Sequence, residues 1–184
     1  MPLLVQILRA NMAQAIDASK DRPSDPRNRE VVFPPNRDPQ WGDLETPINN
    51  SSLTRWFINN LPAYRQGITD QRRGIEAGMA HGYWLLGPFA KLGPLRDTDI
   101  ANIAGLLSTL GMVAISALAI ALYANSNPPN PVANVTTNNR VPDTFKSPEG
   151  WNTYATSFLI GGVGGAVVAY FLLDNIEVIQ RVFG

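Results

Sequence analysis

The chain has 184 residues, with 15 basic and 15 acidic side chains and no cysteine. Its zero net charge disfavours nucleic acid as a partner, because affinity for a phosphate backbone comes mainly from an excess of lysine and arginine. The lack of cysteine excludes disulfides, thiolate metal sites and cysteine nucleophiles. Apolar residues are concentrated in the second half of the chain, and this distribution predicts an all-α membrane protein.

An irregular extramembrane arm is predicted for residues 1–71. Within it, residues 17–46 are rich in proline, aspartate, arginine and asparagine and show no helical or alternating apolar pattern, so we expect irregular structure. A solvated tail and an arm ordered by neighbouring subunits both fit this composition. Met12 is a plausible alternative start, which would leave residues 1–11 outside the mature protein, and the apolar patch 2–8 is too short for a signal peptide.

A membrane domain of three helices is predicted for residues 72–184. Residues 100–123 and 151–173 contain no charged side chain. A helix of that length covers roughly 35 Å, enough to cross a hydrocarbon core of about 30 Å. These two segments are therefore predicted to span the membrane, and residues 124–150 form the proline-rich loop between them.

The first predicted span, 72–92, has charged residues near both ends. Glu76 lies close to its start, and Lys91 can extend its ammonium group to the interface at its other end. Pro88 is expected to kink or end this helix. If the segment is a short buried helix instead, the protein has two spans and both termini lie on the same side of the membrane.

Basic residues around the first span predict its orientation. The loop after this span balances its two basic residues with two acidic ones, whereas the preceding segment has only Asp70 to oppose four arginines: Arg55, Arg65, Arg72 and Arg73. Basic residues favour the cytoplasmic side of a membrane. We therefore expect a cytoplasmic amino terminus and, with three spans, a carboxyl terminus in the opposite compartment.

Aromatic and small residues indicate how the helices are used. Tyr123, Trp151 and Tyr154 stand at predicted span ends, where amphipathic rings favour the interface. Gly161 and Gly165 form a ridge that favours close packing of helices. A second ridge surrounds His81, so helix packing and close approach of a flat cofactor both remain open there; it consists of Gly74, Gly78 and Gly82.

Glu76 and His81, the only histidine, are the candidate functional residues, because ionisable groups at membrane depth usually mark a site. Five residues apart on a helix, they point about 140° from each other and cannot hold one ion together. They suit axial ligation of two chlorophylls, since imidazole nitrogen and carboxylate oxygen are donors that magnesium accepts. The alternatives are a proton relay in a small transporter, and a scaffold in which both residues only stabilise packing, with Glu76 paired with Arg72 or Arg73 near the interface and His81 hydrogen-bonded between helices.

Asp97 and Asp99 form a small acidic group after the first span. Two carboxylates are too few for a self-sufficient calcium site. We expect a solvated turn in which one of them caps the next helix. The chain also lacks a nucleophile-base pair and a Gly-x-Ser-x-Gly motif, so an enzyme is not expected.

Four short motifs follow one another along the chain: Asn-Leu-Pro-Ala-Tyr-Arg-Gln-Gly at 60–67, Gly-Met-Ala-His-Gly-Tyr at 78–83, Gly-Pro-Phe-Ala-Lys-Leu-Gly-Pro-Leu-Arg-Asp at 87–97 and Glu-Gly-Trp at 149–151. In order and spacing they resemble subunit XI of the photosystem I reaction centre, from about Pro39 to the end. The resemblance implies a non-catalytic, multi-pass subunit of the thylakoid membrane, with a cytoplasmic or stromal amino terminus and a lumenal carboxyl terminus.

The resemblance also implies ligands and partners. The family binds antenna chlorophyll a and β-carotene, contacts the photosystem I core heterodimer, small membrane subunits and lipids, and mediates oligomerisation of reaction-centre monomers. Glu76 and His81 would be the axial chlorophyll ligands. Asp97, with the carbonyl of Pro94, would contact calcium at a boundary between monomers. The longer loop, with Asn127–Pro131, and the extended arm are similar to members whose complexes are dimers or tetramers.

Overall fold

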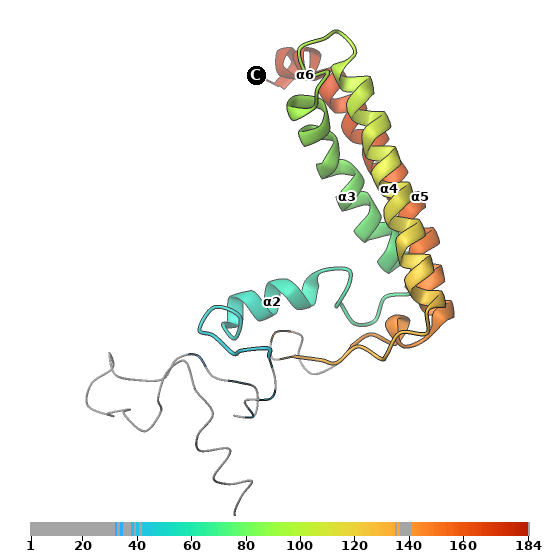
Figure 1. Ribbon diagram of the computed structural model, residues 1–184. Helices are drawn as coiled ribbons and strands as arrows, with labels where there is room; N and C mark the ends of the chain where they lie inside the picture. Colours follow the sequence, from blue (N-terminus) through green and yellow to red (C-terminus); the bar gives the residue numbers. More distant parts are fainter. Residues whose placement is uncertain are drawn as a thin grey trace, which may run out of the picture. The chain divides into compact units, whose positions relative to one another are not determined.

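The computed structural model describes residues 32, 34, 38, 40, 42–134, 136 and 141–183 (Figure 1). Regular structure in these residues is helical, without a β-strand, which confirms the all-α prediction for this part of the chain. The chain divides into two compact units, one containing Met1–Asn59 and Val132–Arg140, the other Asn60–Pro131 and Val141–Gly184. The predictions for Met12 and for residues 1–31 lie outside the described residues.

Helix α2, Ser52–Asn60, lies in the first unit, in the segment predicted to be an irregular arm. Ser51 begins it, because its hydroxyl accepts a hydrogen bond from the backbone N–H of Thr54 at 3.2 Å. The Asn59 amide donates to the carbonyl of Thr136 at 2.7 Å, so the end of α2 is tied to the loop at 132–136. The prediction of irregular structure is therefore wrong for residues 52–60.

The second unit contains α3 (Asp70–Leu92), α4 (Ala101–Asn125) and α5 (Pro148–Asp174), which lie side by side in Figure 1. Their bounds agree with the three predicted spans to within a few residues. Helices α4 and α5 are long and apolar enough to cross a membrane. Within the described residues α3 is not among the helices that meet this criterion. Its first two turns carry four charged side chains: Asp70, Arg72, Arg73 and Glu76.

Side-chain caps begin two of the three long helices. Thr69 accepts from the backbone N–H of Arg72 at the start of α3, and Ser147 accepts from that of Gly150 at the start of α5. Helix α4 has no side-chain cap, so the prediction that Asp97 or Asp99 caps it is wrong. A backbone turn takes that place, with the Ala101 N–H donating to the Thr98 carbonyl at 3.1 Å.

Pro88 lies inside α3, and the helix continues to Leu92. Of the two predicted effects of this proline, an end of the helix is therefore wrong, and a kink stays a prediction. Between the second and third long helices lies the short 3₁₀ helix η5, Asp143–Lys146, and after α5 follows the short helix α6, Ile176–Phe183.

Glycines bring α3 and α5 into backbone contact. A Cβ atom added to Gly74, Gly78 or Gly82 would clash with backbone atoms of α5, and one added to Gly161 or Gly165 would clash with backbone atoms of α3. Both ridges therefore serve helix packing, as predicted for the pair on α5 and left open for the ridge on α3. The core beside this contact consists of Ala77, Val113, Ala117, Tyr154 and Phe158.

Large apolar side chains cover the outside of the bundle. On α4, Leu107, Ile115, Leu118 and Leu122 are all at least 60% exposed, and on α5 Ile160 and Phe171 are similarly exposed. A monomeric soluble protein rarely exposes so continuous an apolar surface. This surface is suited to lipid or to other membrane subunits.

The aromatic residues at the predicted span ends form a cluster. The Trp151 ring lies 5.3 Å from that of Tyr123 and 4.5 Å from that of Phe145 in η5, between ring centroids. Its indole N–H donates to the Phe145 carbonyl at 3.1 Å. Tyr154 is buried, so it does not face the surface of this unit.

Candidate functional site

His81 lies on the exposed side of α3, one turn beyond Ala77. Its Nδ1 is 2.7 Å from the Ala77 carbonyl oxygen, and its ring centroid is 5.3 Å from that of Phe158. Because a carbonyl only accepts hydrogen bonds, this contact requires the proton on Nδ1. The lone pair of a neutral His81 is then on Nε2, which has no hydrogen-bond partner among the described residues.

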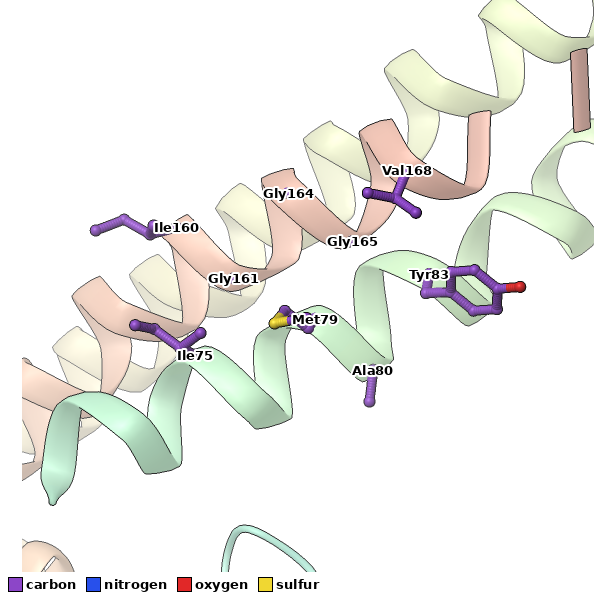
Figure 2. Close-up of a pocket in the computed structure, with 9 residues that line it drawn as sticks. All are labelled: Ile75, Met79, Ala80, Tyr83, Ile160, Gly161, Gly164, Gly165 and Val168. Carbon is purple, nitrogen blue, oxygen red and sulfur yellow. The ribbon is translucent and has the colours of Figure 1, made fainter. Parts of the chain in front are cut away.

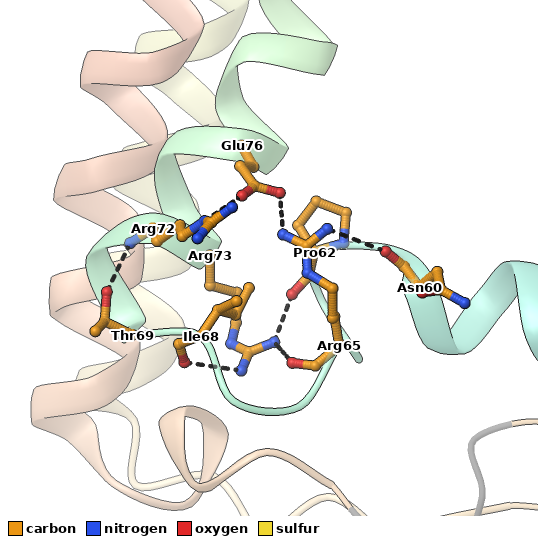
Figure 3. Close-up of polar contacts among 8 residues, drawn as sticks. All are labelled: Asn60, Pro62, Arg65, Ile68, Thr69, Arg72, Arg73 and Glu76. Atoms are coloured by element: carbon orange, nitrogen blue, oxygen red, sulfur yellow. Dashed lines mark hydrogen bonds and ion pairs between the residues drawn. The ribbon is translucent and has the colours of Figure 1, made fainter.

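Glu76 is held by two arginines (Figure 3). Arg72, one turn earlier on α3, donates from Nε to Oε1 at 2.6 Å, and Arg65 donates from Nη2 to Oε2. The Glu76 side chain is 28% exposed. The pairing with Arg72 agrees with the packing alternative, which expected Arg72 or Arg73, whereas the participation of Arg65 was not predicted.

Arg73 is buried at 2% exposure and organises the segment before α3. Its guanidinium donates to the Arg65 carbonyl at 2.9 Å, and also to the carbonyls of Pro62 and Ile68 (Figure 3). Its Nε lies 3.2 Å from the Thr144 hydroxyl, which itself donates to Asp70. Because Arg73 fixes the backbone at Arg65, it also sets the position from which Arg65 reaches Glu76.

The sequence indicates Arg65 only as a basic residue flanking a span, and Arg73 as such a residue or as a partner of Glu76. The signal that could have identified Arg73 is its place at the first turn of a helix that begins with a threonine cap, close to a Pro-containing turn. That signal is weak without the fold. The burial of Arg73 depends on Thr144, which is 71 residues further along the chain.

The structure keeps the two candidate ligands apart. Glu76 contacts Arg65 and Arg72, whereas His81 contacts Ala77 and Phe158, and the two side chains share no hydrogen-bond partner in the part of the chain that the structure describes. This separation agrees with the angle of about 140° expected from their spacing. Each residue can therefore serve only a site of its own.

Asp97 and Pro94 lie in the connection between α3 and α4. The Asp97 carboxylate is 82% exposed and lies 3.5 Å from the Arg96 guanidinium. Among the described residues there is no group of three or more acidic or histidine side chains that could hold a metal. The acidic side chains near Asp97 are therefore too few to hold a cation by themselves.

An apolar groove of about 550 Å³ runs between α3 and α5 (Figure 2). Its α3 side is lined by Ile75, Met79, Ala80 and Tyr83, and its α5 side by Ile160, Gly161, Gly164, Gly165 and Val168. Because glycine has no side chain, the α5 side of the groove is formed partly by backbone atoms. Sequence analysis named no residues for such a groove.

Two long apolar helices, packed through glycines against a third helix with an outward-facing histidine, define a small helical protein of the membrane-subunit class. The family model for "Photosystem I reaction centre subunit XI" matches residues 31–178. The chain belongs to the photosystem I reaction centre subunit XI family.

Individual relatives agree with this assignment. Photosystem I reaction center subunit XI of Mastigocladus laminosus is 69% identical over 173 residues, covering 94% of this chain and 99% of that protein. The Nostoc sp. subunit is 67% identical, covering 94% and 100%. The Thermosynechococcus vestitus subunit is 43% identical over 153 residues, covering 83% and 94%.

Family membership confirms the resemblance seen in the motifs. The chain is a photosystem I subunit, associates with that complex in the thylakoid membrane, takes part in photosynthesis and is not an enzyme. The residues that bind ligands and the way copies assemble do not follow from membership alone.

Proposed function

We propose that this subunit binds antenna chlorophyll a and mediates oligomerisation of photosystem I reaction-centre monomers. The observation that carries the pigment assignment is the state of His81: its side chain is exposed, its Nδ1 is engaged by the Ala77 carbonyl, and its Nε2 has no hydrogen-bond partner among the described residues. Bound chlorophyll would absorb light and pass the energy to the core by through-space coupling. The protein's task is to fix the position and orientation of the pigment.

His81 has the features of a metal-ligating imidazole. Metal-bound histidines usually donate their second ring N–H to a carbonyl or carboxylate, which fixes the ring orientation and raises the basicity of the ligating nitrogen. The Ala77 carbonyl supplies that contact from the same helix. Phe158 packs against one side of the ring and limits its rotation. The ligand is thus oriented before a pigment binds.

Glu76 is the second proposed chlorophyll ligand, with less support from the geometry. Each of its carboxylate oxygens already accepts from an arginine. An ionised carboxylate has about four lone-pair sites, so ligation would use one that Arg65 and Arg72 leave free. The two arginines would then orient the carboxylate toward its magnesium, as Ala77 orients His81.

Replacing His81 by leucine tests the pigment proposal. We expect His81→Leu to remove one chlorophyll a per reaction-centre monomer while the subunit still assembles, because leucine fills similar space without a donor atom. Pigment extraction from the purified complex, normalised to the reaction-centre chlorophylls, gives the count. Met79→Leu, at an exposed position on the same helix, is the matched control and should lose none.

An unchanged pigment count in His81→Leu would contradict ligation and favour the scaffold hypothesis, in which the histidine only stabilises packing. The transporter hypothesis finds little support in the contacts of Glu76. A relay needs groups that exchange a proton, and this carboxylate is paired with two arginines and shares no partner with His81 among the described residues.

We assign β-carotene to the groove of Figure 2. The groove lies along two long helices and is lined almost wholly by apolar side chains and glycine, as a hydrocarbon polyene requires. Tyr83 at one end is the only lining residue with a polar side-chain atom.

Three membrane spans are proposed, with α3 as the first. Its 23 residues extend roughly 35 Å, and it packs along α4 and α5 over its length (Figure 1). The charges of its first two turns are neutralised by mutual contacts, since Glu76 pairs with two arginines. Three spans place the two termini on opposite sides, and the basic residues before α3 favour an amino terminus on the stromal side, a lumenal carboxyl terminus and an extramembrane arm up to residue 71.

Oligomerisation is proposed to involve Asp97 and the Pro94 carbonyl as calcium ligands, completed by a neighbouring copy. The exposure of the Asp97 carboxylate supports this assignment, because a shared site must be reachable from outside. We expect both chelation of calcium and Asp97→Asn to convert most of the larger photosystem I species to monomers on a native gel. Added calcium should restore the wild type and not the variant.

Asp99→Asn is the matched control for this experiment and should leave the gel pattern unchanged. Deleting the whole subunit sets the reference for complete loss of the larger species. If deletion gives monomers but chelation and Asp97→Asn do not, the subunit mediates assembly without calcium. If deletion also leaves the larger species intact, the oligomerisation proposal fails.

A further inference from the structure

Helix α6 is an amphipathic helix that the proposed pigment and assembly functions do not use. Its exposed apolar residues are Ile176, Val178 and Val182. Its polar residues are Glu177, Gln180 and Arg181, and the first and last of these form an ion pair at 3.6 Å. Val178 and Val182 lie one turn apart, and Gln180 lies about 160° around the helix axis from Val182.

The place of α6 in the fold limits what can cover its apolar side. Figure 1 shows it at the end of the bundle where α5 ends. The break between the helices is a single residue, Asn175, whose backbone and side chain both donate to the Phe171 carbonyl. Close by, the side chain of Asn102 at the start of α4 donates to Asp174. Polar groups therefore lie at the start of α4 and at the end of α5, just before α6 begins.

Ile176, at the start of α6, continues the apolar outer surface of the bundle and lines a groove together with Leu172 and Leu173 of α5 and Pro88 of α3. It lies about 160° around the helix axis from Val178 and about 40° from Gln180, so it stands at the edge of the apolar side, next to the polar one. Phe171 and Leu172 are themselves exposed. A helix with this division, placed where apolar spans end, is suited to the boundary between lipid headgroups and acyl chains.

We propose that α6 lies in the membrane interface, with Val178 and Val182 in contact with lipid and Gln180 facing water. This inference rests on the proposed membrane topology of α4 and α5. Because Glu177 and Arg181 neutralise each other, the polar side offers no net charge to lipid headgroups. Contact should therefore depend on burial of apolar surface and not on anionic lipid.

The absence of cysteine from the chain allows a direct test. A nitroxide is attached to Val182→Cys or to Gln180→Cys in assembled photosystem I, which is placed in galactolipid nanodiscs with or without anionic phosphatidylglycerol. Labelled wild-type complex gives the background from other subunits. Electron paramagnetic resonance then compares relaxation by oxygen, which partitions into lipid, with relaxation by a water-soluble nickel complex.

We expect oxygen to relax the label at Val182 severalfold more than nickel, the reverse at Gln180, and no change when anionic lipid is added. Nickel access at Val182 would overturn the inference, and so would protection from both agents, which indicates a protein neighbour. Val178→Cys repeats the test at a second apolar position. Ile115→Cys on α4 distinguishes a failure of this inference from a failure of the proposed spans, because nickel access at Ile115 would contradict the spans themselves.

Discussion

Gly78→Ala is expected to displace α3 from α5 and to remove most of the subunit from photosystem I. The added methyl group would meet the Phe158 carbonyl and the Gly162 backbone, neither of which can rotate away as a side chain would. Overpacking of this kind typically costs about 1–3 kcal/mol, more than the roughly 1 kcal/mol that alanine gains over glycine in a helix. Quantitative mass spectrometry of the purified complex measures how much subunit remains.

Gly111→Ala is the matched control for this experiment. Gly111 lies in α4, and nothing stands within 4 Å of the position that its Cβ would occupy. The same substitution there adds helix propensity without a clash, so full occupancy is expected. Equal retention of the two variants would contradict the view that glycine contacts hold the bundle together.

Arg73→Met is expected to release the segment before α3. The substitution leaves the carbonyls of Pro62, Arg65 and Ile68 without their shared donor, and hydrogen bonds to a charged group contribute about 1.5–3 kcal/mol each. We expect the free energy that stabilises this segment to fall by at least about 3 kcal/mol. The change would be seen as faster hydrogen-deuterium exchange at residues 62–68. Because Arg65 then loses its fixed position, Glu76 should lose one of its two partners.

Arg96→Met provides the comparison for Arg73→Met. Arg96 is half exposed and makes a 3.5 Å contact with Asp97, and such surface pairs contribute little. Exchange in residues 62–68 should be unchanged in this variant. If Arg73→Met also leaves that exchange unchanged, Arg73 does not organise the segment.

The long helices could be predicted from the sequence because their physical signal is local. Residues 100–123 and 151–173 are uncharged over membrane length, and α4 and α5 follow those limits closely. The glycine ridge on α5 likewise predicted close packing, since glycine at every fourth position lets two backbones meet. These features need no knowledge of distant residues.

The parts that could not be predicted depend on contacts between segments that are distant in the sequence, or on which of several neighbouring groups forms a local hydrogen bond. Arg73 is buried only because Thr144 and the 62–68 segment surround it. The turn before α4 uses the backbone of Thr98 instead of an aspartate cap, although two aspartates lie beside it. Helix α2 forms in a segment whose composition favours irregular structure, and its end is held by Thr136.

The candidate site shows the same division. The angle between Glu76 and His81 follows from helix geometry, and the structure keeps them apart as expected. Sequence could not indicate that His81 bonds within its own helix through Nδ1, because the rotamer depends on packing against Phe158 of α5. That packing also decides which nitrogen bonds to Ala77 and which keeps its lone pair.

A density map of photosystem I containing this chain, at a resolution that shows individual tetrapyrroles, tests the central claim most directly. We predict a chlorophyll magnesium within bonding distance of His81 Nε2, with Nδ1 still on the Ala77 carbonyl. A map that shows Nε2 bound to a neighbouring protein group, or no tetrapyrrole over His81, would contradict the assignment of this residue as a chlorophyll ligand.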